Sequence, residues 1–206
     1  MLAASLIKGI LLGLGAAAPI GPVNVEIARR SIRAGWPAGF LLGLGAVTVD
    51  VSYIILLGLG FQPLLRFPGL KIILAIGGVL LLGYLGIMSL RSARRDYHRG
   101  LPEDGNQPVR RNYLTGLAMT SLNPMTLAFW FLVVPTYASD IRTDLPLLAI
   151  GVLIGTVSWV VFFSTVMSLA GKIARRKALF LADACGGLVL LGFAALTIWR
   201  LMRPAL

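Results

Sequence analysis

Six long apolar stretches constrain this chain more than any other feature of its sequence. Each is close to the roughly 20 residues that a helix needs to cross about 30 Å of hydrocarbon. Open strands cannot cross lipid, so we expect a helix in each stretch. The expected spans are Ser5–Ile27, Ala38–Gly60, Gly69–Leu90, Tyr113–Tyr137, Pro146–Ala170 and Leu181–Leu201. The sequence therefore predicts an all-α integral membrane protein with six transmembrane helices.

The composition favours a lipid environment over a soluble fold. Of the 206 residues, 57% are hydrophobic and 13% are charged. The net charge of +11 would suit a nucleic-acid binder, but such a protein needs its Lys and Arg gathered on a folded polar surface. Here they lie in short gaps between apolar stretches, so we expect the lipid bilayer, and no nucleic acid, as a partner. The single Cys185 allows neither an intramolecular disulfide nor a zinc-type pair.

The distribution of Lys and Arg predicts how the chain is oriented. The gaps after the first, third and fifth stretches carry thirteen of these residues, and the other side carries six. Cytoplasmic loops carry the excess of positive charge. We therefore expect a multi-pass protein of the bacterial inner membrane with both termini facing outward. Residues 92–112, which contain the single His98, are expected to form a basic cytoplasmic linker.

The two halves of the chain resemble each other in sequence. Gly77–Tyr84 matches Gly186–Phe193, and Val51–Tyr53 matches Val157–Trp159. Apolar helices resemble one another by chance, but the shared glycine spacing favours a repeat. Residues 1–91 and 113–206 would then each cross the membrane three times, and an odd number of crossings makes the second half inverted. Inverted three-helix repeats are typical of secondary transporters.

Asp50 is an acidic residue near the middle of the second expected span, with no basic residue in that span. An ionisable group at such depth is costly and usually functional. Loss of water favours a protonated carboxyl, whereas a nearby cation favours the carboxylate, so this group could exchange a proton for a cationic substrate group. The alternative is a structural aspartate bonded to neighbouring hydroxyl or amide groups.

Two proline-containing breaks interrupt the first and fourth expected spans. They are Pro19–Pro22 and Asn123–Pro124, and each frees backbone groups that must be satisfied by neighbours or by water in a cavity. Polar side chains suited to a carboxylate or an ammonium group lie nearby. The predicted pathway comprises Pro19, Gly21, Pro22, Asn24, Asp50, Thr120, Ser121, Asn123 and Pro124. The alternative is a pair of kinks that only shape packing.

Other noticeable residues have simpler interpretations. Glycines four residues apart, Gly39 with Gly43 and Gly151 with Gly155, favour close helix packing and would also permit a homodimer. Glu26 is placed for an ion pair with the arginines one turn further on, and Asp183 has no assigned role. We find no enzyme motif, no cofactor-binding motif and no metal-ligand cluster, so we expect neither an enzyme nor a cofactor.

Three sites together resemble the LysE/RhtB family of amino-acid exporters: Gly21-Pro22-Val23-Asn24, Asp50 and Leu122-Asn123-Pro124. The resemblance covers essentially the whole chain. It implies export of amino acids or close analogues, driven by proton exchange, through six helices or a closely similar fold. The first two sites resemble the branch for basic substrates, although Val23 and Phe129 depart from it. The third resembles the branch for neutral substrates except at Met125, so the charge of the substrate stays open.

The leading hypothesis is a proton-coupled exporter in which Asp50 handles the proton or the substrate ammonium group. A small-ion or metal-ion exporter would use the same fold, although the sequence lacks the ligand cluster that selective metal binding needs. A non-transporting scaffold subunit of the membrane is the other alternative.

Overall fold

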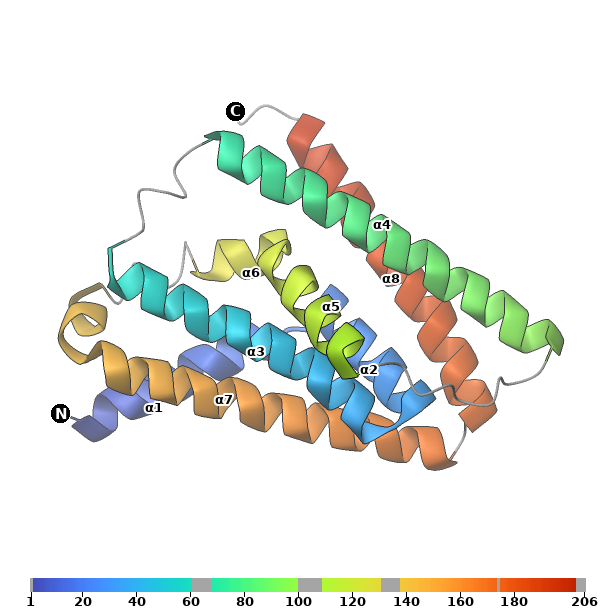
Figure 1. Cartoon of the computed structure of the whole chain (residues 1–206), viewed down its shortest axis with the longest axis horizontal. Coiled ribbons are helices and arrows are strands. Elements are labelled where there is room, and N and C mark those ends of the chain that lie inside the picture. The colour runs from blue at the N-terminus through green and yellow to red at the C-terminus, as the bar shows by residue number, and fades with distance from the viewer. Residues whose placement is uncertain (1, 61–67, 100–108, 131–137, 174, 203–206) are drawn as a thin grey trace.

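A computed structural model of the chain describes residues 2–60, 68–99, 109–130, 138–173 and 175–202. Within these ranges the fold is all-helical and contains no strand, which confirms the predicted class. The helices in chain order (Figure 1) are α1 (Leu2–Ala17), α2 (Pro22–Ala34), α3 (Trp36–Gly58), α4 (Pro68–Arg99), α5 (Val109–Ser121), α6 (Pro124–Ala128), α7 (Ala138–Ile173) and α8 (Arg175–Met202).

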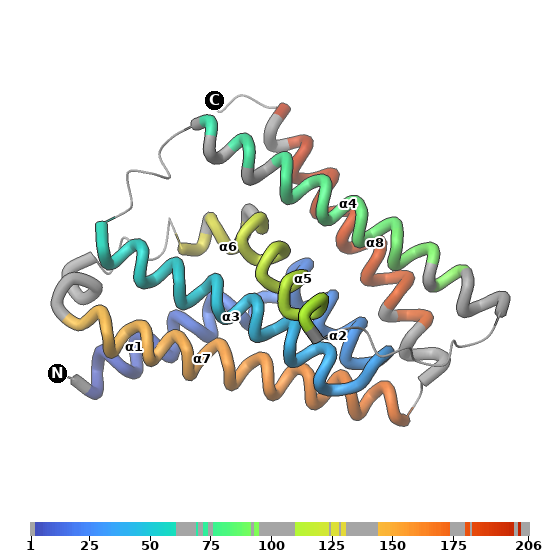
Figure 2. The backbone as a smooth tube through the Cα atoms, viewed as in Figure 1, coloured from blue at the N-terminus to red at the C-terminus, as the bar shows by residue number. Residues whose placement is uncertain are grey.

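The helices form two groups joined by α2. Helices α4 and α8 lie along each other as one pair, and α1, α3, α5 and α7 form the other group. Helix α2 contacts α3, α7 and α8, so it lies between the groups. The tube in Figure 2 follows the same path and shows α5 lying over α3. Pro22 and Asn24, in the first turn of α2, are buried.

Two helices are long and apolar enough to cross a membrane by themselves: α3 and residues Asp144–Ile173 of α7. Helices α1 and α2 would together form a third span, bent by 77° at the break between them. Shorter apolar helical segments cover Ile76–Arg91 and Asp183–Trp199. The fold is thus that of a helical membrane protein, and the arrangement of six spans stays a prediction.

The expected linker is partly helical. Helix α4 continues to Arg99 and α5 begins at Val109, so both ends of the range 92–112 belong to helices. Residues 100–108 lie outside the described part of the chain, as do residues 131–137 at the end of the fourth expected span.

Both predicted breaks are present. Helix α1 ends at Ala17, and α2 begins with Pro22 in its first turn after an extended Gly21. Proline has no amide hydrogen and disfavours helical geometry in the residue before it, which explains why the helix stops and restarts here. In the second break, Asn123 caps α6 by accepting a hydrogen bond from the amide of Met125 at 3.0 Å.

The largest helix contacts form reciprocal pairs between the two expected halves. They are α1 with α7, α3 with α5, α3 with α7, and α4 with α8. If the two halves are exchanged, α1 corresponds to α5, α3 to α7 and α4 to α8. The contact of α1 with α7 then corresponds to that of α5 with α3. The contacts of α3 with α7 and of α4 with α8 each correspond to themselves. A two-fold internal repeat would produce this pattern. The inversion of the second half stays a prediction.

Glycines allow the close approach in these pairs. A Cβ added to Gly45 of α3 would collide with the backbone of α5 at Tyr113, and one added to the matching Gly151 of α7 would collide with α1 at Leu6. A Cβ added to Gly43 would instead collide with the side chain of Val160 in α7. These glycines therefore serve contacts within one chain, and a homodimer stays a prediction.

We expect Gly116→Ala to lower the midpoint temperature of thermal unfolding of the purified protein in detergent by about 5 °C. A Cβ at this position would collide with the carbonyl oxygen of Leu42 in α3, which cannot rotate away as a side chain would. The matched control is Gly83→Ala in α4, because a Cβ there meets nothing within 4 Å. Alanine has a higher helix propensity than glycine, so the control should keep or raise the midpoint temperature. Equal shifts for the two variants would contradict the packing account.

Candidate functional site

Six of the nine predicted site residues line one cavity of about 50 Å³. They are Pro19, Gly21, Asn24, Asp50, Thr120 and Asn123. The remaining lining includes Thr126, Thr156 and Trp159, which the sequence analysis did not assign to the pathway. The cavity therefore lies where the two helix breaks face the middle of α3 and α7.

The other three predicted residues have local positions. Pro22 is buried in the first turn of α2, and Pro124 begins α6. The hydroxyl of Ser121 donates to the carbonyl of Leu117 in its own helix at 2.8 Å, and its backbone carbonyl accepts from the hydroxyl of Tyr53 at 3.1 Å. None of the three is among the residues that line the cavity.

Asp50 is 5% exposed and faces the cavity from α3. Its Oδ1 accepts a hydrogen bond from the indole Nε1 of Trp130 at 2.8 Å, and Trp130 is itself fully buried. No Lys or Arg among the described residues forms an ion pair with this carboxyl group. One neutral donor compensates only part of the cost of burying a carboxylate, so a proton or a cation is needed to neutralise it.

Asn24 satisfies the backbone that the first break frees. Its amide nitrogen donates to the carbonyls of Ala17 at 2.7 Å and of Pro19 at 2.9 Å. Its oxygen accepts from the indole Nε1 of Trp159 at 3.2 Å. Such carbonyls cannot stay unpaired in the membrane interior, so Asn24 holds the bend between α1 and α2 in shape at the cavity wall.

Tyr53 and Trp159 have equivalent roles in the two halves. They occupy matching positions in the sequence repeat, on α3 and α7. Tyr53 donates to the carbonyl of Ser121 at the second break, and Trp159 donates to Asn24 beside the first. Helix α3 of the first half thus bonds to the break in the second half, and α7 of the second half bonds to a residue beside the break in the first half.

The start of α2 offers unused hydrogen-bonding capacity to the cavity. The first amide groups of a helix have no partner within the helix, and the helix dipole makes this end attractive to anions. Gly21 caps α2 without a side-chain hydrogen bond, and both Gly21 and Val23 line the cavity. The hydroxyl of Thr120, which is 3% exposed, has no hydrogen-bond partner in the described structure. The cavity therefore combines a buried carboxyl group with a neutral, anion-favouring region.

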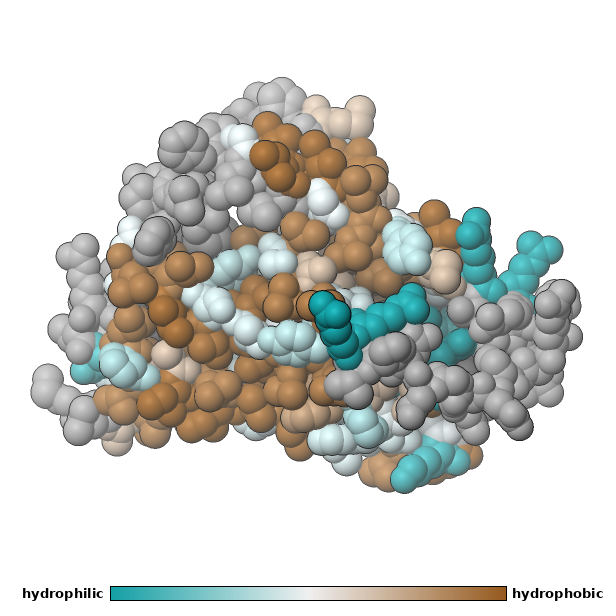
Figure 3. Space-filling model, in the orientation of Figure 1, coloured by the Kyte–Doolittle hydropathy of each residue, from teal (hydrophilic) through white to brown (hydrophobic). Residues whose placement is uncertain are grey.

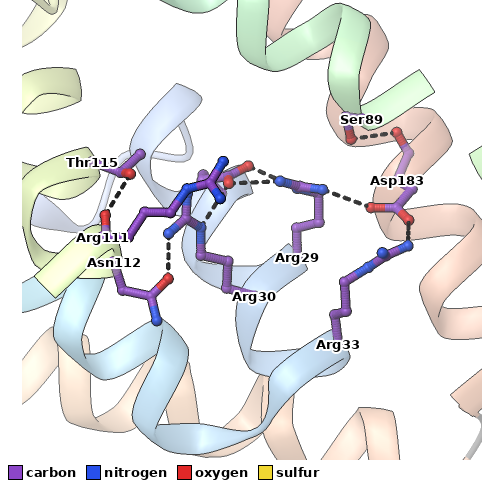
Figure 4. A network of polar contacts seen from close by, with 9 residues as sticks. Arg29, Arg30, Arg33, Ser89, Arg111, Asn112, Thr115 and Asp183 are labelled. Carbon is purple, nitrogen blue, oxygen red and sulfur yellow. Dashed lines mark hydrogen bonds and ion pairs between the residues drawn. The ribbon is translucent and has the colours of Figure 1, made fainter. Parts of the chain in front are cut away.

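Further along α2, arginines form a network with two buried acids (Figure 4). Glu26 accepts hydrogen bonds from Arg29 and Arg30 at 2.8 Å, which confirms the predicted local ion pair. Asp183 of α8 pairs with Arg29 at 3.3 Å and with Arg33 at 2.7 Å. Arg30 also donates to Asn112 of α5. The network therefore fastens α2 to both α8 and α5.

The described residues contain no group of three His, Cys, Asp or Glu side chains placed to hold a metal ion. Among the residues that the structure describes, Asp50 has Trp130 and Tyr53 nearby rather than a second carboxyl group. The observed chemistry is that of one buried carboxyl group in a polar cavity.

Comparisons with known proteins identify the family. The model of the LysE type translocators matches residues 14–200. YcgF of Bacillus subtilis (strain 168), named as a candidate amino acid efflux protein, is 28% identical over 193 residues, which cover 89% of this chain and 90% of that protein. YggA of Aeromonas salmonicida, named as a candidate amino-acid transporter, is 28% identical over 200 residues, which cover 93% of this chain and 94% of that protein.

A third relative has a name of another kind. The chemotactic transduction protein ChpE of Pseudomonas aeruginosa is 26% identical over 124 residues, covering 60% of each chain. No solved structure matches the chain. The family match confirms the resemblance that the three sequence sites indicate. The chain belongs to the LysE type translocator family, whose members are membrane transporters and not enzymes.

Proposed function

We propose that this protein exports amino acids or close analogues from the cytoplasm across the bacterial inner membrane, in exchange for protons. The observation that carries the proposal is the cavity in which both helix breaks meet the buried carboxyl group of Asp50. Broken helices that meet at mid-membrane are where secondary transporters bind substrate. The names of YcgF and YggA, which refer to amino acid efflux and amino-acid transport, support the same substrate class.

The two chemical regions of the cavity suit the two ends of an amino acid. The ammonium group would pair with Asp50, which has no cationic partner among the described residues. The carboxylate would bind at the start of α2, where the free amides and the hydroxyl of Thr120 can donate to it. In this orientation the side chain of the substrate would face the remaining lining.

The cavity must enlarge during transport. Its volume of about 50 Å³ holds a few water molecules, well below the roughly 300–1,000 Å³ of sites that enclose drug-sized ligands. Movement of residues 1–91 against residues 113–206, as inverted repeats around a fixed site, would open it to each side in turn. The breaks at Pro19–Pro22 and Asn123–Pro124 are the places where the helices can bend. In the proposed orientation, both termini of the chain face outward.

The proposed proton exchange uses Asp50, the one acidic residue among the described residues that line the cavity. A substrate ammonium that arrives from the cytoplasm displaces the proton from Asp50, and a proton that arrives from outside releases the ammonium group. The carboxyl group of Asp50 is then neutralised in both loaded forms, by a proton in one and by the substrate ammonium in the other. The carboxylate of the substrate is stabilised by the start of α2 and the hydroxyl of Thr120.

Counterflow in proteoliposomes tests how the substrate is recognised. Vesicles that contain the purified protein and a high internal concentration of an amino acid should take up the same labelled amino acid. The corresponding amine without a carboxylate, and the acid without an amine, should compete at least about tenfold more weakly, because each leaves one charged region of the cavity unpaired. Competition by either truncated analogue as strong as that of the full amino acid would contradict the proposed orientation. Absence of all exchange by the folded protein would contradict amino-acid transport itself.

A further inference from the structure

A second and larger cavity lies between α4 and α5, outside the proposed transport site. It has a volume of about 480 Å³. One wall is formed by Leu81, Tyr84 and Leu85, which share a face of α4 because they are three and four residues apart. The opposite wall includes Leu114 and Ala118 of α5. The walls are therefore mainly apolar.

Three arginines line one end of this groove: Arg30 of α2, and Arg110 and Arg111 of α5. Arg110 and Arg111 are exposed, and no carboxylate among the described residues forms an ion pair with either. Arg30 lies close enough to Arg111 for their like charges to repel. Hydrophilic atoms gather at this end of the visible face, where α5 begins, whereas apolar atoms cover much of the helices around it (Figure 3). Arg110 and Arg111 thus have positive charge that no described carboxylate balances.

The groove therefore combines an anion-binding end with apolar walls that run along two membrane helices. Positive charge beside an apolar groove matches a molecule with an anionic head and a hydrocarbon tail. Basic pockets between transmembrane helices on the cytoplasmic side bind the head groups of anionic lipids. The excess of Lys and Arg predicts that these arginines are on that side.

We propose that the groove between α4 and α5 is a specific site for an anionic phospholipid. The phosphate binds between Arg110 and Arg111, close to Arg30, and an acyl chain lies along Leu81, Leu85 and Leu114. Because Arg30 also pairs with Glu26 and donates to Asn112, the lipid head contacts the network that fastens α2 to α5. The site does not depend on the transported substrate.

Native mass spectrometry of the purified full chain in detergent tests the site. Phosphatidylglycerol should bind as one tightly held molecule, at least about tenfold more tightly than phosphatidylcholine, because each nearby arginine favours the anionic head. The double variant Arg110→Gln/Arg111→Gln should lose about tenfold or more of this affinity. The variant Ala118→Phe, which fills the groove without changing charge, should also weaken binding.

The matched control is Arg91→Gln/Arg94→Gln, which removes the same charge from exposed positions on α4 outside the groove. It should bind phosphatidylglycerol within about twofold of the native chain. Equal losses in the control and the groove variant, or equal binding of phosphatidylcholine, would overturn the site as a specific one. Displacement of the lipid by inorganic phosphate at the same concentration would also overturn it, because the acyl chain would then contribute nothing.

Discussion

Replacement of Asp50 by Asn is expected to reduce proton-driven amino-acid transport to the level of vesicles without the protein. In inside-out vesicles with an acidic interior, the native chain should accumulate amino acid because protons leave as substrate enters. The variant has no carboxyl group to carry the proton, so the pH gradient cannot drive it. Labelled amino-acid uptake measured with and without the imposed gradient checks this result.

The Asp50→Asn substitution should leave the fold of the protein nearly unchanged. Its side-chain oxygen can still accept the hydrogen bond from Trp130, which now ends at Oδ1 of Asp50. A matched control is Trp130→Phe, which removes this donor and leaves the acid in place. The control should lose some stability and keep its response to the gradient. A variant at Asp50 that responds to the gradient as the native chain does would place proton coupling elsewhere.

Replacement of Glu26 by Gln is expected to destabilise the protein more than any other single neutralisation in the network. Glu26 is fully buried and accepts from both Arg29 and Arg30. Removing one member of a buried ion pair costs about 3–5 kcal/mol, because it leaves uncompensated charge behind. For a chain of this length, the midpoint temperature of thermal unfolding in detergent should fall by about 10 °C.

A second substitution separates this charge effect from a general effect of changing a buried residue. In Glu26→Gln/Arg30→Gln, one positive charge is removed together with the negative one, so part of the lost stability should return. Arg91→Gln gives the baseline, since that arginine is exposed, forms no ion pair with a described carboxylate and lies outside the groove between α4 and α5. If the double variant is no more stable than the single one, charge balance does not explain the role of Glu26.

Much of the candidate site follows from the sequence because its residues break simple rules. An acid in an apolar span and prolines within helical segments are costly in lipid, so Asp50 and the two breaks can be recognised without coordinates. The structure brings these positions to one cavity. Ser121 was a less specific prediction, because a helical serine can bond to the preceding turn of its own helix, as it does here with Leu117.

The remaining features depend on how helices rotate against one another, which a single sequence does not state. The hydrogen bond from Trp130 to Asp50 joins residues eighty positions apart, and an apolar helix offers no polar face from which its rotation could be inferred. The contact between Trp159 and Asn24 could not be predicted for the same reason. The pairing of Asp183 with Arg29 and Arg33 depends on how α8 packs against α2, which a single sequence does not state either. A signal was nevertheless present, since Tyr53 and Trp159 occupy matching positions in the repeat.

The most direct test of the central claim is to record amino-acid flux and internal pH together in proteoliposomes that contain the purified protein. The account predicts that a gradient of amino acid alone moves protons in the opposite direction through the native chain, and that Asp50→Asn stops this proton movement. Amino-acid flux through the native chain without any proton movement would contradict it.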